Sequence, residues 1–178
     1  MAGNVVRYHT WPVLIQQTNA HHTWNVLRIM VEIWPQTPQD ILLHTIFHDG
    51  GELGPGDIPF PYKSQNPVLK KAVHDLEVQS LRDQGVWRLT TTRDDDDEWL
   101  HRAKTCDLIE MLEKGLEEYL LGNYYGWGVV EQIMSTLSVR QHPRPDDAVL
   151  VSQYITRRLE RFEAIIIQGG KKSWSPVS

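Results

Sequence analysis

Apolar and polar positions follow a helical period along most of the chain. Apolar residues three or four positions apart, such as Val26, Ile29, Met30 and Ile33, put one side of a segment into a core. With capping residues, prolines and glycines as boundaries, this period predicts helices over 19–34, 38–48, 67–84, 99–121, 123–138 and 146–167. The sequence therefore predicts an all-α protein, a single domain (1–178) of about six helices with its core at 7–167 and a flexible tail at 168–178.

Local signals refine the ends and faces of these helices. Thr18 is predicted to cap the first helix, Thr37 before Pro38 to cap the second, and Asn66 before Pro67 to cap the third. Residues 1–17 are expected to be irregular. Among the apolar positions, the period also turns Ile46 and Leu150 towards the core.

Composition narrows the class of protein. One cysteine, Cys106, excludes an internal disulfide and fits a reducing compartment. The sequence shows no signal peptide and no bilayer-length apolar run, so a cytoplasmic protein without a membrane partner is expected. A net charge of −5 argues against binding a nucleic-acid polymer. Seven tryptophans is a high count: core packing is their commoner use, a pocket lining is an alternative, and exposed ones would mark a subunit contact, so a homo-oligomer is expected.

The most informative stretch is the end of the second predicted helix and the loop after it. The helix ends in His48-Asp49, and the loop carries Glu52, Asp57 and Lys63 among glycines and prolines. Because glycine and proline break helices, these carboxylates are held on a turn. An imidazole beside a carboxylate suits a borderline divalent cation. The alternative is a polar helix end that leads into an ordinary surface loop.

Two further polar residues are predicted to point inward. His22 lies one turn before Val26 and therefore on the buried face of the first helix. Asp107 lies between apolar residues, and a buried carboxylate needs a cation or strong donors. Lys104, one turn earlier, could supply an ion pair, and a metal ion could equally be the partner. The residues alone leave both possibilities open.

Taken together, these motifs resemble those of a known family. His22, then His48-Asp49, then Asp107 follow the H…HD…D order of the HD-domain phosphohydrolases, and more narrowly of the bacterial 5′-deoxynucleotidases and their phage relatives. The resemblance covers roughly residues 7–120. It is carried by Arg7, by Asn19-Ala20-His21-His22-Thr23, by Lys104-Thr105-Cys106-Asp107 and by the long central motif His48-Asp49-x-x-Glu52-x-x-x-Gly56-Asp57-x-Pro59-x-Pro61-x-Lys63.

The resemblance implies a role for each of these positions. The metal ligands would be His22, His48, Asp49 and Asp107, holding one divalent ion such as cobalt, manganese, zinc or iron, with room for magnesium on the substrate phosphates. Glu52 and Asp57 would be the catalytic acid/base carboxylates. The implied substrate-binding residues are Arg7, Tyr8, Trp11, Pro61, Lys63 and Lys104.

The activity expected from this resemblance is metal-dependent hydrolysis of deoxynucleotide phosphoesters. The first expectation is a 5′-deoxynucleotidase that releases phosphate from deoxynucleoside monophosphates. The alternative within the class is a triphosphohydrolase that prefers dATP and releases triphosphate. A non-catalytic helical module that binds metal or nucleotide is the alternative from another class, and the two carboxylates on the loop argue against it.

Overall fold

The structure is a computed structural model that describes residues 2–8, 12–56, 58, 65–90 and 97–168. It divides into two compact units, Met1–Glu110 and Met111–Ser178. The prediction of one domain over the whole chain stays a prediction, and the expected tail lies almost wholly outside the described residues.

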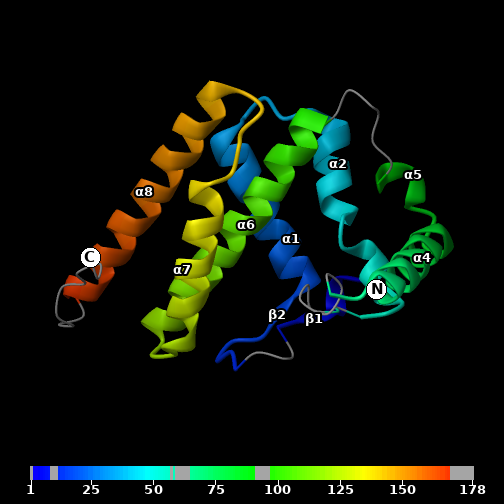
Figure 1. Cartoon of the computed structure of the whole chain (residues 1–178), viewed down its shortest axis with the longest axis horizontal. Helices are drawn as coiled ribbons and strands as arrows, with labels where there is room; N and C mark the ends of the chain where they lie inside the picture. Colours follow the sequence, from blue (N-terminus) through cyan, green and yellow to red (C-terminus); the bar gives the residue numbers. More distant parts are fainter. Residues whose placement is uncertain (1, 9–11, 57, 59–64, 91–96, 169–178) are drawn as a thin grey trace. The chain divides into compact units, whose positions relative to one another are not determined.

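The fold is all-α, as predicted. Within the described residues there are six α-helices of nine residues or more, which Figure 1 shows in chain order. They are α1 (Asn19–Ile33), α2 (Gln39–Phe47), α4 (Pro67–Asp83), α6 (Asp97–Leu120), α7 (Tyr125–Ser138) and α8 (Pro145–Gln168). Shorter helical pieces are η1 (Ala2–Asn4), η2 (Gly50–Leu53) and α5 (Trp87–Thr90). No helix in the described ranges combines the length and apolarity needed to cross a membrane.

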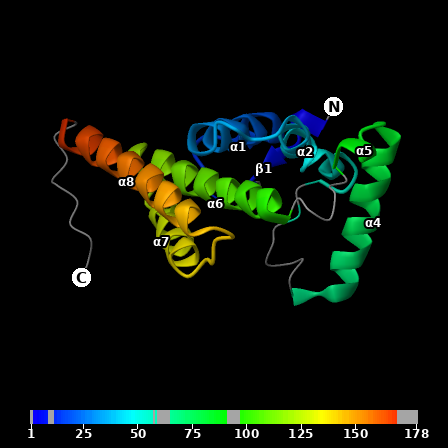
Figure 2. The ribbon, with the colours of Figure 1, turned by 90° about the horizontal axis from the view of Figure 1, so that it is seen from above.

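The core of the first unit is built on α1. Thr18 caps this helix by accepting a hydrogen bond from the His21 amide, as predicted. The predicted stripe of Val26, Ile29, Met30 and Ile33 is buried, and α1 contacts α2. Figure 2, seen from above, shows α1 running beside α6, whose residues up to 110 belong to the same unit. The helical period thus identified the buried face of α1 correctly.

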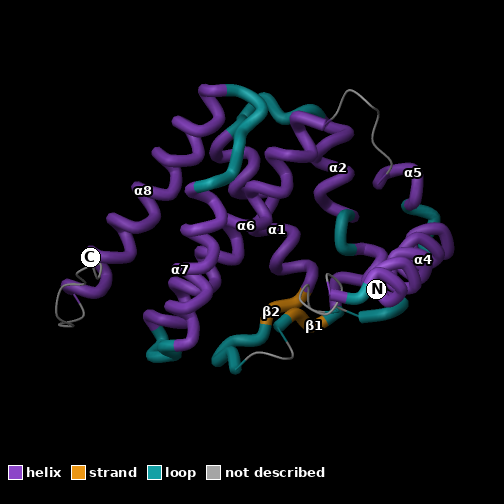
Figure 3. The backbone as a smooth tube through the Cα atoms, viewed as in Figure 1, coloured by secondary structure: helices purple, strands orange, loops and turns teal. Residues whose placement is uncertain are grey.

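A short two-stranded sheet at the start of the chain was not predicted. Strand β1 (Val6–Arg7) pairs antiparallel with β2 (Gln17–Thr18), with Arg7 opposite Gln17 (Figure 3). The Asn19 amide continues this pairing by donating to the carbonyl of Val5 at 2.9 Å. The sheet fixes Arg7 beside the N-terminus of α1, where an irregular arm was expected.

Three local expectations were wrong. The Thr37 hydroxyl donates to the Trp34 carbonyl at 2.7 Å, so it closes the turn after α1, and Pro38 takes the cap position of α2 without a side-chain bond. Ile46 is 41% exposed and Leu150 is 37% exposed. Each lies one position, or about 100° around its helix, from a buried neighbour. The buried face of each helix is therefore narrower than the apolar face that the sequence predicted.

In the second unit, α6 and α7 approach each other through glycine. A Cβ added at Gly126 would lie 2.5 Å from the Gly115 carbonyl oxygen, a distance that no larger residue could accept without moving a helix. The aromatic rings of Tyr119 and Phe162, on α6 and α8, lie 6.0 Å apart. Close backbone contact and aromatic packing therefore hold these three helices together.

In the first unit, η2 packs against α4, and this contact fixes the turn that follows α2. Asn66 caps α4 by accepting from the amides of Val68 and Leu69, as predicted. A Cβ added at Gly51 of η2 would lie 2.8 Å from the Glu77 Cβ and 2.9 Å from the Glu77 carbonyl oxygen. Only glycine allows this separation of η2 and α4.

We expect Gly51→Ala to lower the free energy of unfolding by about 1–3 kcal/mol, because the added methyl group overpacks this contact. Chemical denaturation followed by circular dichroism measures the change. Gly128→Ala is the matched control, since nothing lies within 4 Å of a Cβ built there and alanine favours the helix. A Gly51→Ala protein as stable as the Gly128→Ala protein would contradict the prediction.

Candidate metal centre

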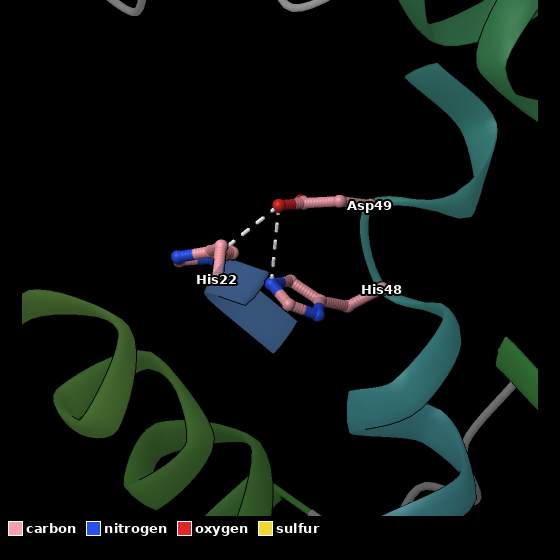
Figure 4. Close-up of side chains that lie close together, drawn as sticks. All are labelled: His22, His48 and Asp49. Atoms are coloured by element: carbon pink, nitrogen blue, oxygen red, sulfur yellow. Dashed lines mark ion pairs between the residues drawn. The ribbon is translucent and has the colours of Figure 1, made fainter. Parts of the chain in front are cut away.

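Three side chains from two parts of the first unit converge on one point. His22 comes from α1, His48 follows the last residue of α2, and Asp49 precedes η2. Their potential ligand atoms all lie within 4.8 Å of one another. Asp49 Oδ2 is 3.4 Å from His22 Nε2 and 3.4 Å from His48 Nε2, and Figure 4 shows both rings directed at this carboxylate. The structure therefore brings together three of the four predicted ligands.

Each imidazole is anchored through its other nitrogen. His48 Nδ1 lies 2.6 Å from the Thr45 carbonyl oxygen, which can only accept, so Nδ1 carries the hydrogen. His22 Nδ1 lies 2.8 Å from Glu110 Oε2. Both Nε2 atoms are buried without a hydrogen-bond partner among the described residues. Ring nitrogens that face a carboxylate and have no hydrogen-bond partner are typical donors to a metal ion, so these residues fit a divalent cation.

The fourth predicted ligand, Asp107 of α6, lies at the edge of this group. Its Oδ1 is 3.3 Å from His22 Nε2, and its other oxygen accepts a charged hydrogen bond from Lys104. The carboxylate is buried, whereas the Lys104 side chain is 63% exposed. The ion pair that the sequence left open is therefore present, and the same carboxylate also faces the metal-type cluster.

Buried charge makes this cluster a strong attractor for a cation. Burial alone lowers the pKa of His22, but the nearby carboxylates of Asp107 and Glu110 raise that pKa from 6.5 to about 9. Burial alone raises the pKa of Asp107, but His22 and Lys104 hold it well below its usual range. The pKa of Asp49 is lowered in the same way by His48 and Arg7, against the effect of burial. A metal ion would take the place of the proton on His22.

Glu52 and Arg7 border the cluster. Glu52, in η2, is buried and accepts a hydrogen bond from Asn19 Nδ2 at 2.7 Å. Arg7 forms an ion pair with Asp49, and its Nη1 lies 4.0 Å from Glu52 Oε2. Burial would lower the pKa of Arg7, but the neighbouring carboxylates, Asp49 first, raise it above its usual value. Arg7 therefore carries a permanent positive charge beside the cluster.

Of the other predicted site residues, the structure describes Tyr8 but not the remaining four. The Tyr8 ring lies 5.8 Å from the Arg7 guanidinium, and Tyr8 has a positive φ of 56°, an uncommon backbone conformation for a bulky residue. Asp57, Trp11, Pro61 and Lys63 lie outside the residues that the structure describes. Their predicted roles therefore stay predictions.

Neither Glu110 nor Asn19 was predicted to have a role in the site. Glu110 is 1% exposed and lies three residues after Asp107, on the same face of α6. This three-residue spacing is the sequence feature from which the position of Glu110 beside Asp107 could have been predicted. Asn19 is the first residue of α1, a position where a polar side chain is usually explained by capping.

Comparison with known proteins identifies the fold. No protein-family model matches the chain, and no curated protein sequence matches it. A solved structure does: the HD phosphohydrolase DatZ of cyanophage S-2L, bound to dA and one catalytic Zn2+ ion. The likeness has a TM-score of 0.68 at 20% sequence identity and covers 90% of this chain and 93% of that chain. This chain has the fold of an HD phosphohydrolase.

The HD fold agrees with the arrangement of the cluster. The predicted ligands come from α1, from the end of α2 and from α6, in the chain order of the H…HD…D pattern. The predicted all-α HD fold is therefore confirmed.

A pH dependence follows from the raised pKa of His22. In protein stripped of metal by a chelator, protonated His22 stabilises the folded state fully below its unfolded pKa of about 6.5. This contribution is lost as the pH rises towards about 9. We expect the free energy of unfolding to fall over this interval by an amount on the order of a few kcal/mol, measured by denaturation at a series of pH values.

His22→Gln should flatten this pH dependence, because the titrating group is removed. His21→Gln should keep it, since the neighbouring His21 side chain is exposed. Equal pH profiles for the two variants would show that His22 does not carry the effect.

Proposed function

We propose that this protein is a metal-dependent phosphohydrolase that acts on deoxynucleotides, most simply a 5′-deoxynucleotidase releasing phosphate from deoxynucleoside monophosphates. The observation that carries the proposal is the convergence on the carboxylate of Asp49 of two imidazole nitrogens that have no hydrogen-bond partner among the described residues. The presence of dA and a catalytic Zn2+ ion in the cyanophage neighbour supports a deoxynucleoside ligand and a metal.

His22, His48, Asp49 and Asp107 would hold the ion. The donor set of two nitrogens and two carboxylates suits zinc, and also cobalt, manganese or iron. Magnesium would accompany the substrate phosphates. The bound ion would supply Lewis acidity, which stabilises charge on a phosphoryl oxygen and favours attack by water at neutral pH.

The side chains around the ion would transfer the proton and bind the phosphate. Glu52 would accept the proton from the attacking water or donate one to the departing ribose oxygen, while Asn19 fixes the orientation of its carboxylate. Arg7, always charged and fork-shaped, would exchange its contact with Asp49 for the phosphoryl oxygens. Lys104 would give a second, more mobile positive charge.

The other predicted substrate contacts complete this proposal. Asp57 would share the acid/base role with Glu52, Lys63 would join Arg7 at the phosphate, and Tyr8, Trp11 and Pro61 would contact the base and sugar. We also retain the expectation of a cytoplasmic homo-oligomer with a small-molecule substrate.

Metal-supplemented incubation with a panel of deoxynucleoside mono- and triphosphates tests the function. Release of inorganic phosphate from monophosphates supports the nucleotidase, and release of triphosphate supports the alternative, a dATP-preferring triphosphohydrolase. Chromatography of the products separates the two. Metal-dependent binding of deoxynucleotide without any product would favour the non-catalytic module.

Glu52→Gln should lower kcat by roughly 10²- to 10⁴-fold, because the amide keeps the shape of the side chain but cannot move a proton. The metal content, measured by atomic absorption, should stay that of the unaltered protein, since Glu52 is not among the proposed ligands. Glu32→Gln is the control: Glu32 is a surface residue paired with Arg28, and its loss should leave kcat unchanged. Full activity of the Glu52→Gln protein would remove Glu52 from the mechanism.

A further inference from the structure

The carboxylate of Glu110 is buried next to the candidate metal centre without being one of its proposed ligands. It is 1% exposed and lies close to three polar side chains. Its Oε2 is 2.8 Å from His22 Nδ1, and its Oε1 accepts from Gln17 Nε2 at 2.6 Å and from Asn25 Nδ2 at 3.3 Å. The proposed hydrolysis uses none of these contacts.

We propose that Glu110 is a positioning residue that holds His22 as an Nε2 ligand and thereby sets the affinity of the centre for divalent metal. This inference rests on the proposed metal-dependent function. A carboxylate that accepts the Nδ1 hydrogen of a histidine leaves the lone pair on Nε2, orients the ring and makes Nε2 a stronger donor. Here that lone pair points towards Asp49 and Asp107.

The hydrogen bonds to the other oxygen, Oε1, keep the Glu110 carboxylate oriented towards His22. Because Gln17 and Asn25 both donate to Oε1, rotation of the carboxylate away from His22 would break two further bonds. These donors also offset much of the cost of burying the charge. Oε2 is thus directed at His22 Nδ1.

The same carboxylate reaches the strand pair that carries Arg7. Gln17 lies in β2 opposite Arg7 of β1, so the bond from Gln17 to Glu110 ties that strand pair to α6. Glu110 therefore links the position of a proposed metal ligand to the position of the proposed phosphate contact.

The two histidines differ in this respect. His48 Nδ1 donates to the carbonyl of Thr45, whereas the partner of His22 Nδ1 is the carboxylate of Glu110, a stronger kind of acceptor. Loss of the charge on Glu110 should therefore weaken metal binding through His22 alone and leave the orientation of His48 unchanged.

Calorimetric titration of zinc into metal-free protein tests the inference. We expect Glu110→Gln to weaken zinc binding by roughly 10- to 100-fold while circular dichroism stays unchanged. Glu118→Gln is the matched control, because Glu118 is another buried glutamate of α6, 2% exposed, whose carboxylate bonds to Lys114 and Asn123. Zinc affinity in Glu110→Gln equal to that of the unaltered protein would overturn the proposal.

A second measurement needs no variant and stands even if Glu110→Gln fails to fold. In zinc-loaded protein labelled with ¹⁵N-histidine, NMR should show His22 protonated at Nδ1 and bound to metal through Nε2. Metal bound at Nδ1, or an unprotonated Nδ1, would overturn the inference.

The two proposals fail in different ways. Unaltered protein that binds no metal would remove the proposed function, and the role of Glu110 with it. Unaltered protein that binds zinc, together with a Glu110→Gln protein that binds it equally well, would remove the role of Glu110 alone.

Discussion

The constraint behind this site is the concentration of carboxylates around one fully buried imidazole. Asp49, Asp107 and Glu110 each lie within 3.4 Å of a nitrogen of His22, which is 0% exposed. Carboxylates in a dry environment are costly unless cations or donors compensate them. Arg7 and Lys104 supply part of that compensation from outside the cluster. Positive charge on these side chains offsets part of the cost of burying the carboxylates, and a divalent ion at the centre would do the same.

Three local interactions, each in a separate segment, position the side chains of this cluster. The Thr18 cap starts α1 at the position that turns His22 inward. The Thr45 carbonyl, one turn before His48, fixes the ring of that histidine at the end of α2. Gly51 lets η2, which carries Glu52, lie against α4. Each interaction involves only a few residues, and the site forms where the three segments meet.

The sequence predicted the parts of this structure that depend on neighbours along the chain. Helical period and capping chemistry are local, so the bounds of α1 and the Asn66 cap were predicted closely. His22 was predicted to be buried because it shares a helix face with Val26. The H…HD…D order then suggested which distant residues meet, and the structure brings His22, His48 and Asp49 together.

What the sequence did not predict depends on contacts between distant segments. The pairing of β1 with β2 involves only two residues in each strand, too few for any alternating pattern. The role of Glu110 needs Gln17, 93 residues away, and His22, 88 residues away. The exposure of Ile46 depends on how much of α2 its neighbours cover. In each case the residue type was compatible with several structures, and packing selected one.

The charges around the cluster also bear on the length of the phosphate chain that would bind. Arg7 is largely buried, lies in β1 and is permanently charged, so its proposed contact would be with one phosphoryl group next to a bound ion. Lys104 is 63% exposed and already shares its charge with Asp107, so it compensates additional phosphates only weakly. A triphosphate brings several more negative charges than a monophosphate into a region that already holds several carboxylates. Among the described residues, this balance of charge is the reason for proposing a monophosphate substrate before a triphosphate.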